Sequence, residues 1–272
     1  MLPSIDFNRP DAGQAFVDSL QTFGFAAIDN HPLDTALVDR IYREWSAFFD
    51  SGNADSFAMS KETQDGYFSP EVAESAKGYD EQDYKEYYQF YTWGRCPESL
   101  AAVTQAYFDA AQQLASLLLE WVEAYSPDSV TFSEPLSGMI VDSEQTMLRI
   151  LRYPGVDGSK PVLRAAPHED INLLTVLPAS DAPGLEIMGK GGEWIPVESR
   201  ANRIVINIGD MLQEASGGFF PSTTHQVSTP AGDAGARMSL PLFLHPRPDV
   251  VLSARYTAGT YLQERLDDLG VS

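Results

Sequence analysis

The chain has 272 residues, 43% of them hydrophobic and 21% charged, which is enough apolar sequence to bury a sizeable core and excludes an intrinsically disordered chain. Its 39 acidic residues outnumber the 18 lysines and arginines, and the formal net charge of −21 argues against binding to nucleic acid or an anionic membrane. With a single cysteine, Cys96, the chain can form neither an internal disulfide nor a thiolate zinc site.

The first residues, MLPSIDFNRPDAG, lack the basic segment and the apolar run of a signal peptide. No stretch reaches the roughly 20 apolar residues that span a bilayer. We therefore expect a cytoplasmic protein that acts on a small molecule, as a monomer or a weak homodimer, without membrane or nucleic-acid partners.

The first 140 residues are predicted to be mostly helical. Apolar residues at helical spacing predict helices over 16–23, 33–48 and 100–121, and GFAAID at 24–29 predicts a strand. The segment 51–94 is polar and aromatic with weak periodicity, and we interpret it as irregular. Part of it is expected to cover a functional cavity, because long loops in compact domains are often functional. The alternative is a rigid excursion that covers the junction between helices and sheet.

From about Met147 the pattern changes to short β-branched runs separated by turn residues. Strands are predicted over 147–153, 172–177, 185–188, 193–197, 203–208, 225–229 and 238–244. Their regular spacing indicates a sandwich, jelly roll or barrel. We expect an α+β protein with a mainly β core in a single domain, 1–272. Its predicted parts are a helical region at 1–140 that packs against the core, the β core at 141–250 and a C-terminal helix at 251–272.

Two of the four histidines stand in a pattern typical of a metal site. His168 and Asp170 are predicted at the start of a strand, where residues two apart share a face, and His225 lies in another predicted strand. Two imidazoles and one carboxylate on one face of an octahedral ion leave its other positions open, as in the facial triad of iron(II) oxygenases. A His-x-Asp pair alone also fits two hydrogen-bonded polar residues at a strand end.

Further polar residues surround this pattern. Arg237 and Ser239 share a strand face, where a guanidinium fork beside a hydroxyl can bind a carboxylate; the alternative is a surface ion pair. The motif NIGD at 207–210 is predicted as a turn whose Asn207 and Asp210 bond to backbone. Arginines also lie near the triad in sequence, and they either pair at the surface or bind an anionic substrate: Arg149, Arg152 and Arg164.

Several motifs, in this order and spacing, resemble the isopenicillin N synthase-like family of iron(II) and 2-oxoglutarate-dependent oxygenases. They are PSIDF, FGFAAIDNHPLD, YKEYYQFY, LRILRYP, HEDINLLTVL, GLEI, GEWIPV, IVINIGDMLQEASGGFFPSTTHQV and RMSLPLF. The stretch SGGFFPSTTH is similar to small bacterial members. The chain departs from the family pattern at Leu151, Arg152 and Gln226, which concerns contacts with cosubstrate and substrate rather than the metal ligands.

The resemblance implies a double-stranded β-helix, which is a cupin-like jelly roll, and an iron(II) dioxygenase that uses 2-oxoglutarate and O₂. Such an enzyme oxidises, commonly by hydroxylation, a C–H bond of a small molecule and releases succinate and CO₂. The implied catalytic and metal residues are His168, Asp170 and His225. The residues implied for 2-oxoglutarate are Arg237 and Ser239, which match the positions for its distal carboxylate, and Tyr153.

Four residues are predicted to contact the substrate. Our candidates are Tyr67, Phe68, Arg152 and Arg164, although the aromatic residues also suit simple packing. Two alternatives stay open at this point. One is an oxidase of the isopenicillin N synthase type, which needs no 2-oxoglutarate and uses Arg237 and Ser239 for a substrate carboxylate. The other is a non-catalytic jelly-roll module for binding or sensing.

Overall fold

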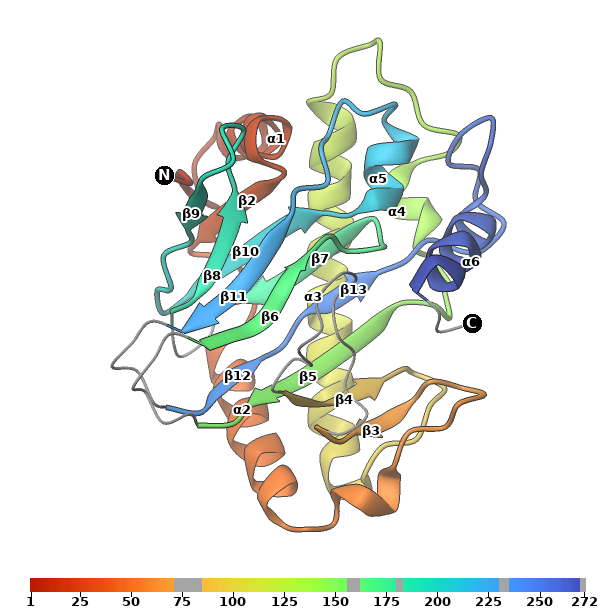
Figure 1. Cartoon of the computed structure of the whole chain (residues 1–272). Helices are drawn as coiled ribbons and strands as arrows, with labels where there is room; N and C mark the ends of the chain where they lie inside the picture. The colour runs from red at the N-terminus through yellow and green to blue at the C-terminus, as the bar shows by residue number, and fades with distance from the viewer. Residues whose placement is uncertain (71–84, 156–161, 180–182, 230–234, 270–272) are drawn as a thin grey trace.

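Two β-sheets lie face to face in the computed structural model, which describes the chain apart from residues 71–84, 156–161, 180–182, 230–234 and 270–272 (Figure 1). The helices are α1 (Ala12–Phe23), α2 (Thr35–Asp50), the 3-10 helix η1 (Ala54–Phe57), α3 (Glu98–Ala124), α4 (Leu136–Met139), α5 (Asp210–Ala215) and α6 (Ala258–Leu269). The strands are β1 (Ser4–Asp6), β2 (Phe25–Asp29), β3 (Gly66–Phe68), β4 (Glu86–Phe90), β5 (Met147–Tyr153), β6 (Val162–His168), β7 (Leu174–Pro178), β8 (Leu185–Met188), β9 (Trp194–Pro196), β10 (Arg203–Ile208), β11 (His225–Thr229), β12 (Arg237–Ser239) and β13 (Leu242–Leu244).

The larger sheet has the strand order β1-β2-β10-β7-β13-β5-β4-β3, and β12 pairs with β5 beside this path. The smaller sheet has the order β6-β11-β8-β9 and lies in front of the larger one in Figure 1. All pairings are antiparallel except that of β1 with β2. This arrangement confirms the predicted mainly β core of jelly-roll type with helices packed against it.

The larger sheet buries both of its faces, because successive side chains of a strand point to opposite sides. On β5, Leu148 and Ile150 join the main core with the buried stripe of α3, which runs behind this sheet in Figure 1. The alternate residues Leu151 and Tyr153 belong to a separate cluster. A third hydrophobic cluster joins β2 and β10 to the smaller sheet, on the same side of the larger sheet as Leu151 and Tyr153. We call the side under the helices the outer face and the side toward the smaller sheet the inner face.

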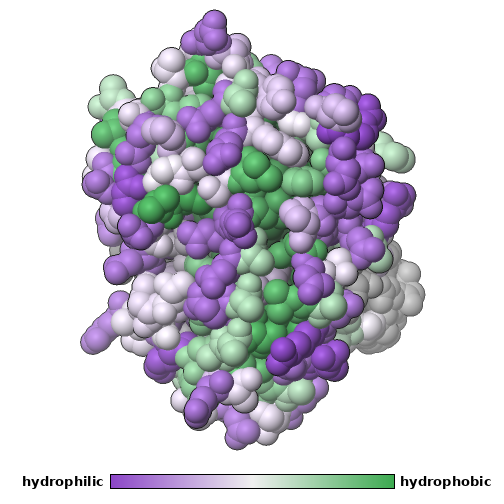
Figure 2. Space-filling model, turned by 180° about the vertical axis from the view of Figure 1, so that it is seen from behind, coloured by the Kyte–Doolittle hydropathy of each residue, from purple (hydrophilic) through white to green (hydrophobic). Residues whose placement is uncertain are grey.

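The helices that cover the outer face follow the predicted apolar stripes. The carboxylate of Asp34 accepts a hydrogen bond of 2.9 Å from the backbone N–H of Ala36 and caps α2, while α1 ends at Gly24 with a left-handed φ of 68°. The helix predicted within 251–272 is α6. Seen from behind, the surface is mostly polar, with apolar side chains gathered in a central band (Figure 2). Among the described helices, none is both long and apolar enough to cross a membrane.

The interpretation of 51–94 as irregular is wrong at two places. Residues 66–68 and 86–90 are β3 and β4, which extend the larger sheet from β5. Every residue of these two strands is buried, including the polar Glu86 and Gln89, so the sequence shows no alternation of apolar and polar residues. The expectation that part of this segment covers a cavity stays a prediction for 71–84, which lie outside the described residues.

Candidate metal centre

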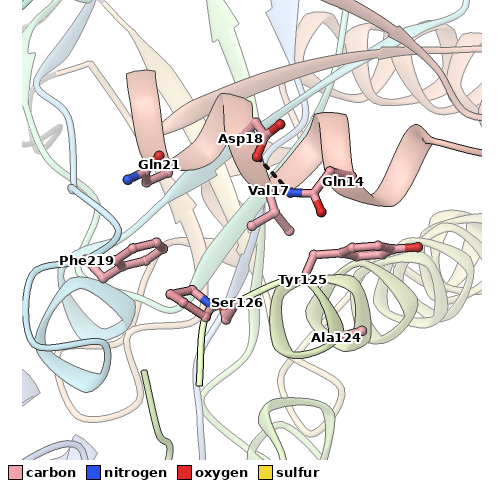
Figure 3. A pocket seen from close by; sticks show the side chains of 9 residues that line it. Gln14, Val17, Asp18, Gln21, Ala124, Tyr125, Ser126 and Phe219 are labelled. Carbon is pink, nitrogen blue, oxygen red and sulfur yellow. Dashed lines mark hydrogen bonds between the residues drawn. The ribbon is translucent and has the colours of Figure 1, made fainter. Parts of the chain in front are cut away.

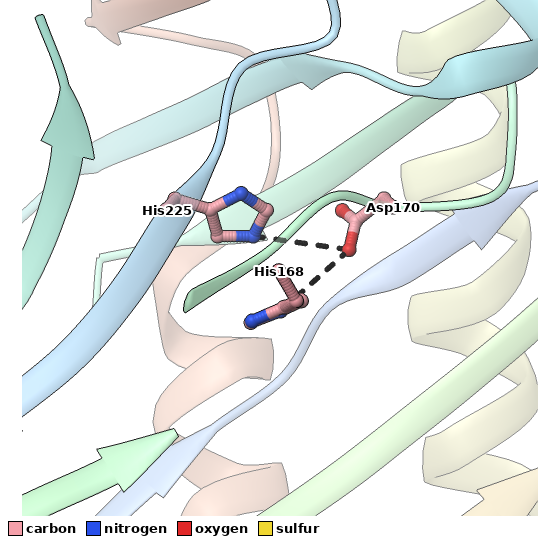
Figure 4. A group of neighbouring side chains, drawn as sticks. All are labelled: His168, Asp170 and His225. Carbon is pink, nitrogen blue, oxygen red and sulfur yellow. Dashed lines mark ion pairs between the residues drawn. The ribbon is translucent and has the colours of Figure 1, made fainter. Parts of the chain in front are cut away.

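His168, Asp170 and His225 converge between the two sheets. One ligand atom from each lies within 4.8 Å of the others. The Nε2 atoms of His168 and His225 lie 3.9 and 3.8 Å from Oδ1 of Asp170 (Figure 4). The two histidines are opposite each other in the pairing of β6 with β11. The His168 side chain is 40% exposed whereas that of His225 is 9% exposed, so the accessible side of the cluster is the His168 side.

The strand-face argument for His168 and Asp170 is wrong, although the two residues do meet. His168 is the last residue of β6, not the first residue of a strand, and Asp170 lies in the turn before β7. The backbone N–H of Asp210, the first residue of α5, donates a hydrogen bond of 2.8 Å to the carbonyl oxygen of Asp170. Asn172 of the same turn packs tightly against Gly209: a Cβ atom added to Gly209 would lie 2.1 Å from Oδ1 of Asn172. Tertiary contacts therefore hold Asp170 in place.

The carboxylate of Asp170 is oriented by two neighbours on the inner face. Thr175 of β7 and Asn207 of β10 are directly opposite each other, and both donate hydrogen bonds to Oδ2, that from Asn207 at 2.8 Å. Thr175 in turn accepts a hydrogen bond of 2.9 Å from Asn172. The other oxygen, Oδ1, is the one that faces the imidazoles. The prediction that Asn207 bonds to backbone is therefore wrong, because its amide holds this carboxylate.

Thr175 and Asn172 were missed by the sequence analysis. The available signal was the presence of buried polar side chains within the otherwise apolar run NLLTVL, since a buried polar group requires a hydrogen-bonding partner. That signal indicates that the two side chains need hydrogen-bonding partners, but it does not identify Asp170 as the group to which Thr175 bonds.

Both histidines present their Nε2 atoms to the cluster. Nδ1 of His168 lies 2.7 Å from the carbonyl oxygen of Ala166, and Nδ1 of His225 lies 3.1 Å from that of Thr223. A carbonyl oxygen can only accept, so each Nδ1 carries the proton and each Nε2 keeps its lone pair for a metal. Hydrogen bonds of this kind fix the tautomer of metal-binding histidines.

The protonation states suit a divalent cation. Burial and the neighbouring His225 lower the pKa of His168 to about 4, so its ring is neutral near pH 7. Burial alone would raise the pKa of Asp170, but the two imidazoles and its hydrogen bonds hold that pKa below its usual value. At neutral pH the separation of 3.9 Å between His168 and Asp170 therefore reflects convergent ligand atoms rather than an ion pair. Two imidazole nitrogens with an ionised carboxylate form a donor set that fits iron(II).

The residues predicted to bind a carboxylate lie on the same inner face. Arg237 and Ser239 are paired in β12 with Tyr153 and Leu151 of β5, which confirms that they share a strand face. Arg237 is buried, and its guanidinium carbon lies 5.9 Å from the centroid of the Tyr153 ring. The alternative of a surface ion pair for Arg237 is wrong, since only 4% of the residue is exposed.

Arg164 of the smaller sheet also approaches Tyr153. Only 2% of it is exposed, and its guanidinium carbon also lies 5.9 Å from the Tyr153 ring centroid. One terminal nitrogen donates a hydrogen bond of 2.6 Å to the carbonyl oxygen of Gly235, while the buried Nε has no hydrogen-bond partner among the described residues. The ring of Tyr153 thus has a buried guanidinium group from each of the two sheets near it.

The other substrate candidates separate between the two faces of the larger sheet. Tyr67 lies on the outer face and donates a hydrogen bond of 2.6 Å to Glu86. Arg152 also bonds to Glu86, at 2.7 Å, and pairs with Asp50 of α2. Phe68 lies on the inner face, in the cluster of Leu151 and Tyr153. The structure therefore brings Phe68 to the side of the metal cluster, and it does not bring Tyr67 or Arg152 there.

A separate pocket of about 450 Å³ lies between α1 and the C-terminal end of α3 (Figure 3). Its lining includes one charged residue, Asp18, which accepts a hydrogen bond from Gln14. None of the three converging residues lines it. This pocket offers no set of ligands or titratable groups comparable with the cluster between the sheets.

Comparisons with known proteins agree with this geometry. Residues 144–246 match the family described as the 2OG-Fe(II) oxygenase superfamily, where 2OG stands for 2-oxoglutarate. Residues 2–109 match the N-terminal region described for the non-haem dioxygenase in morphine synthesis. A curated relative, mugineic-acid 3-dioxygenase of Hordeum vulgare, is 28% identical over 92% of this chain and 75% of its own length.

Solved structures resemble the whole chain. A protein from Shewanella oneidensis, provisionally described as an oxygenase, is 52% identical with a TM-score of 0.91, and the match covers 100% of this chain and 99% of that one. A protein from Caulobacter crescentus, provisionally described as a 2OG-Fe(II) oxygenase family member, is 26% identical with a TM-score of 0.82. That match covers 98% of this chain and 99% of the other.

Proposed function

The chain belongs to the 2OG-Fe(II) oxygenase superfamily, whose members use iron(II) and 2-oxoglutarate, and we propose that it hydroxylates a C–H bond of a small molecule with release of succinate and CO₂. The observation that supports this most directly is the convergence of two Nε2 atoms and one carboxylate oxygen between the sheets. Three protein ligands on one side of an octahedral ion leave positions for the other reactants.

In this proposal His168, Asp170 and His225 hold the iron. The hydrogen bonds from Thr175 and Asn207 keep one Asp170 oxygen directed at the ion, as in other metal sites whose ligands are oriented by neighbouring groups. Bound iron with 2-oxoglutarate and O₂ supplies the oxidation itself, and the protein supplies position and exclusion of water.

Arg237 and Ser239 bind the distal carboxylate of 2-oxoglutarate in this proposal, and Tyr153 lies beside them. A buried guanidinium makes charge-assisted, bidentate bonds to a carboxylate, which a lysine in the same place cannot reproduce. The guanidinium group of Arg164, like that of Arg237, lies 5.9 Å from the centroid of the Tyr153 ring. We therefore assign Arg164 to the 2-oxoglutarate site rather than to the substrate contacts. Its Nε, which has no hydrogen-bond partner in the described part of the chain, supports that assignment.

Succinate release tests the proposal. Purified protein is supplied with Fe(II), ascorbate and 2-oxoglutarate and screened with amino acids, small acids and peptides; we expect a substrate to stimulate stoichiometric succinate formation. Asp170→Ala should bind little iron and form no succinate, because it leaves two of three ligands. Oxidation without succinate would indicate the 2-oxoglutarate-independent oxidase. Negligible metal uptake by the wild-type protein would indicate a non-catalytic module.

A further inference from the structure

The imidazole of His225 is flanked by two other rings. Its centroid lies 4.3 Å from that of His168, with 50° between the ring planes, and 5.3 Å from that of Phe25, with 72° between the planes. His168 is a candidate ligand of the same metal and is the more exposed of the two histidines. Phe25 is the first residue of β2, is only 1% exposed and offers no ligand atom. The buried support of the His225 ring is therefore Phe25.

Strand register places Phe25 in the row of the larger sheet that orients Asp170. Asn207 of β10 is directly opposite Thr175 of β7 on one side and directly opposite Phe25 of β2 on the other. Directly opposite side chains share a face of the sheet, and Asn207 and Thr175 bond to Asp170 on the inner face. One transverse row thus contacts two of the three candidate ligands, Asp170 through hydrogen bonds and His225 through an aromatic ring.

The residue before Phe25 is shaped to fit the segment that leads into His225. Gly24 has a left-handed φ of 68°, and a Cβ atom there would lie 2.2 Å from Oγ1 of Thr223 and 2.5 Å from the carbonyl oxygen of Pro221. Glycine alone combines this φ with so close an approach. The carbonyl oxygen of Thr223 is the one that lies 3.1 Å from Nδ1 of His225. The start of β2 therefore packs against both the ring of this histidine and the backbone that binds it.

The hydrogen bond at Nδ1 does not by itself fix the ring of His225. Its acceptor lies two residues away in the same segment and moves with it, and the ring torsion of histidine is broad. Phe25 comes from a different strand, and its carbonyl oxygen accepts a hydrogen bond of 2.7 Å from the buried hydroxyl of Ser19 in α1. The ring of Phe25 is thus held by α1 and β2, independently of the segment that carries His225.

We propose that Phe25 is a positioning residue of the metal centre: its ring holds the imidazole of His225 with Nε2 toward Oδ1 of Asp170 before a metal binds. This inference rests on the proposed function, in which those two atoms are metal ligands. The N-terminal region matched over 2–109 then contributes to the metal centre although it supplies none of the three candidate ligands. The alternative is that Phe25 only fills core volume beside the smaller sheet, which predicts a loss of stability without an effect on metal binding.

Metal competition with matched core variants distinguishes the two. Phe25→Leu and Phe25→Met remove the ring but keep a large apolar side chain. Phe16→Leu is the control, because Phe16 is also fully buried and makes an edge contact, with Trp121 in the outer core. Zn(II) and Co(II) affinities are measured against a chromophoric chelator. We expect the Phe25 variants to bind about 3–10-fold more weakly, as the loss of an aromatic pair implies, and to change the Co(II) absorption spectrum. Phe16→Leu should lose stability and keep the wild-type affinity and spectrum.

The same contact is measured in the wild type by NMR. The chain has four histidines, so the ring protons of His225 can be assigned. We expect nuclear Overhauser effects between the rings of His225 and Phe25 in both the apo-protein and the Zn(II)-loaded protein. Circular dichroism shows whether the variants are folded, and if they are not, the Overhauser effects decide.

The outcomes separate two failures. A wild-type protein that takes up no metal contradicts the proposed function. Metal uptake by the wild type, with the same affinity and Co(II) spectrum in folded Phe25 variants, overturns the positioning role of Phe25. That role is also overturned if the Overhauser effects are absent from the apo-protein, since the ring would then not be held before the metal binds.

Discussion

Thr175→Val tests whether the hydrogen bonds behind Asp170 determine metal affinity. Valine has nearly the shape of threonine but donates no hydrogen bond, so Oδ2 of Asp170 keeps only the bond from Asn207. A hydrogen bond to a charged group contributes about 1.5–3 kcal/mol. Because every 1.4 kcal/mol corresponds to a factor of about ten, we expect the variant to bind divalent metal about 10–100-fold more weakly.

The assay is competition for Co(II) or Zn(II) against a chromophoric chelator, repeated with Fe(II) under anaerobic conditions. Thr175→Ser keeps the donor and should retain most of the affinity. Thr104→Val is a matched control in α3, because the Thr104 hydroxyl also accepts one buried bond, from Trp45, and donates one, to the Leu100 carbonyl oxygen. It should lose stability without losing metal. Wild-type metal affinity in Thr175→Val, with a loss of stability equal to that of Thr104→Val, would refute the reasoning.

Three further predictions address the cosubstrate, the inner face and the response to pH. Arg237→Lys should raise the apparent KM for 2-oxoglutarate about tenfold or more through loss of the bidentate geometry, and an unchanged KM contradicts this role. Truncation of a buried aromatic residue costs about 3–5 kcal/mol, so both Phe68→Ala and Tyr67→Ala should lower the urea midpoint, but only Phe68→Ala should also weaken substrate use beyond that loss. Burial lowers the pKa of His31, with Asp29 opposing, so below its unfolded pKa of about 6.5 the unfolded chain binds more protons and stability falls. Urea unfolding at pH 7.5 and 5.5 should therefore show a smaller loss of stability in His31→Asn than in the wild type, and an equal or larger loss is the opposing result.

The local sequence pattern was sufficient to predict those helices and strands in which one hydrophobic periodicity dominates. The runs at 147–153, 185–188, 203–208 and 225–229 are strands with the predicted ends, because turn residues flank short β-branched segments. The helical stripes were predicted for the same reason. β3 and β4 were not, because burial on both faces removes the alternation that identifies a half-exposed strand.

The sequence was sufficient to predict the three residues of the candidate metal centre, because the family resemblance added to a His-x-Asp pattern that alone also fits two hydrogen-bonded polar residues. Only the tertiary structure decided how they meet: Asp170 lies outside the strand and is oriented by Asn207, 37 residues away. It also decided that Arg149 lies on the inner face and Arg152 on the outer face. Which strands become neighbours, and in which register, depends on long-range pairing, and a shift of one residue would exchange the two faces.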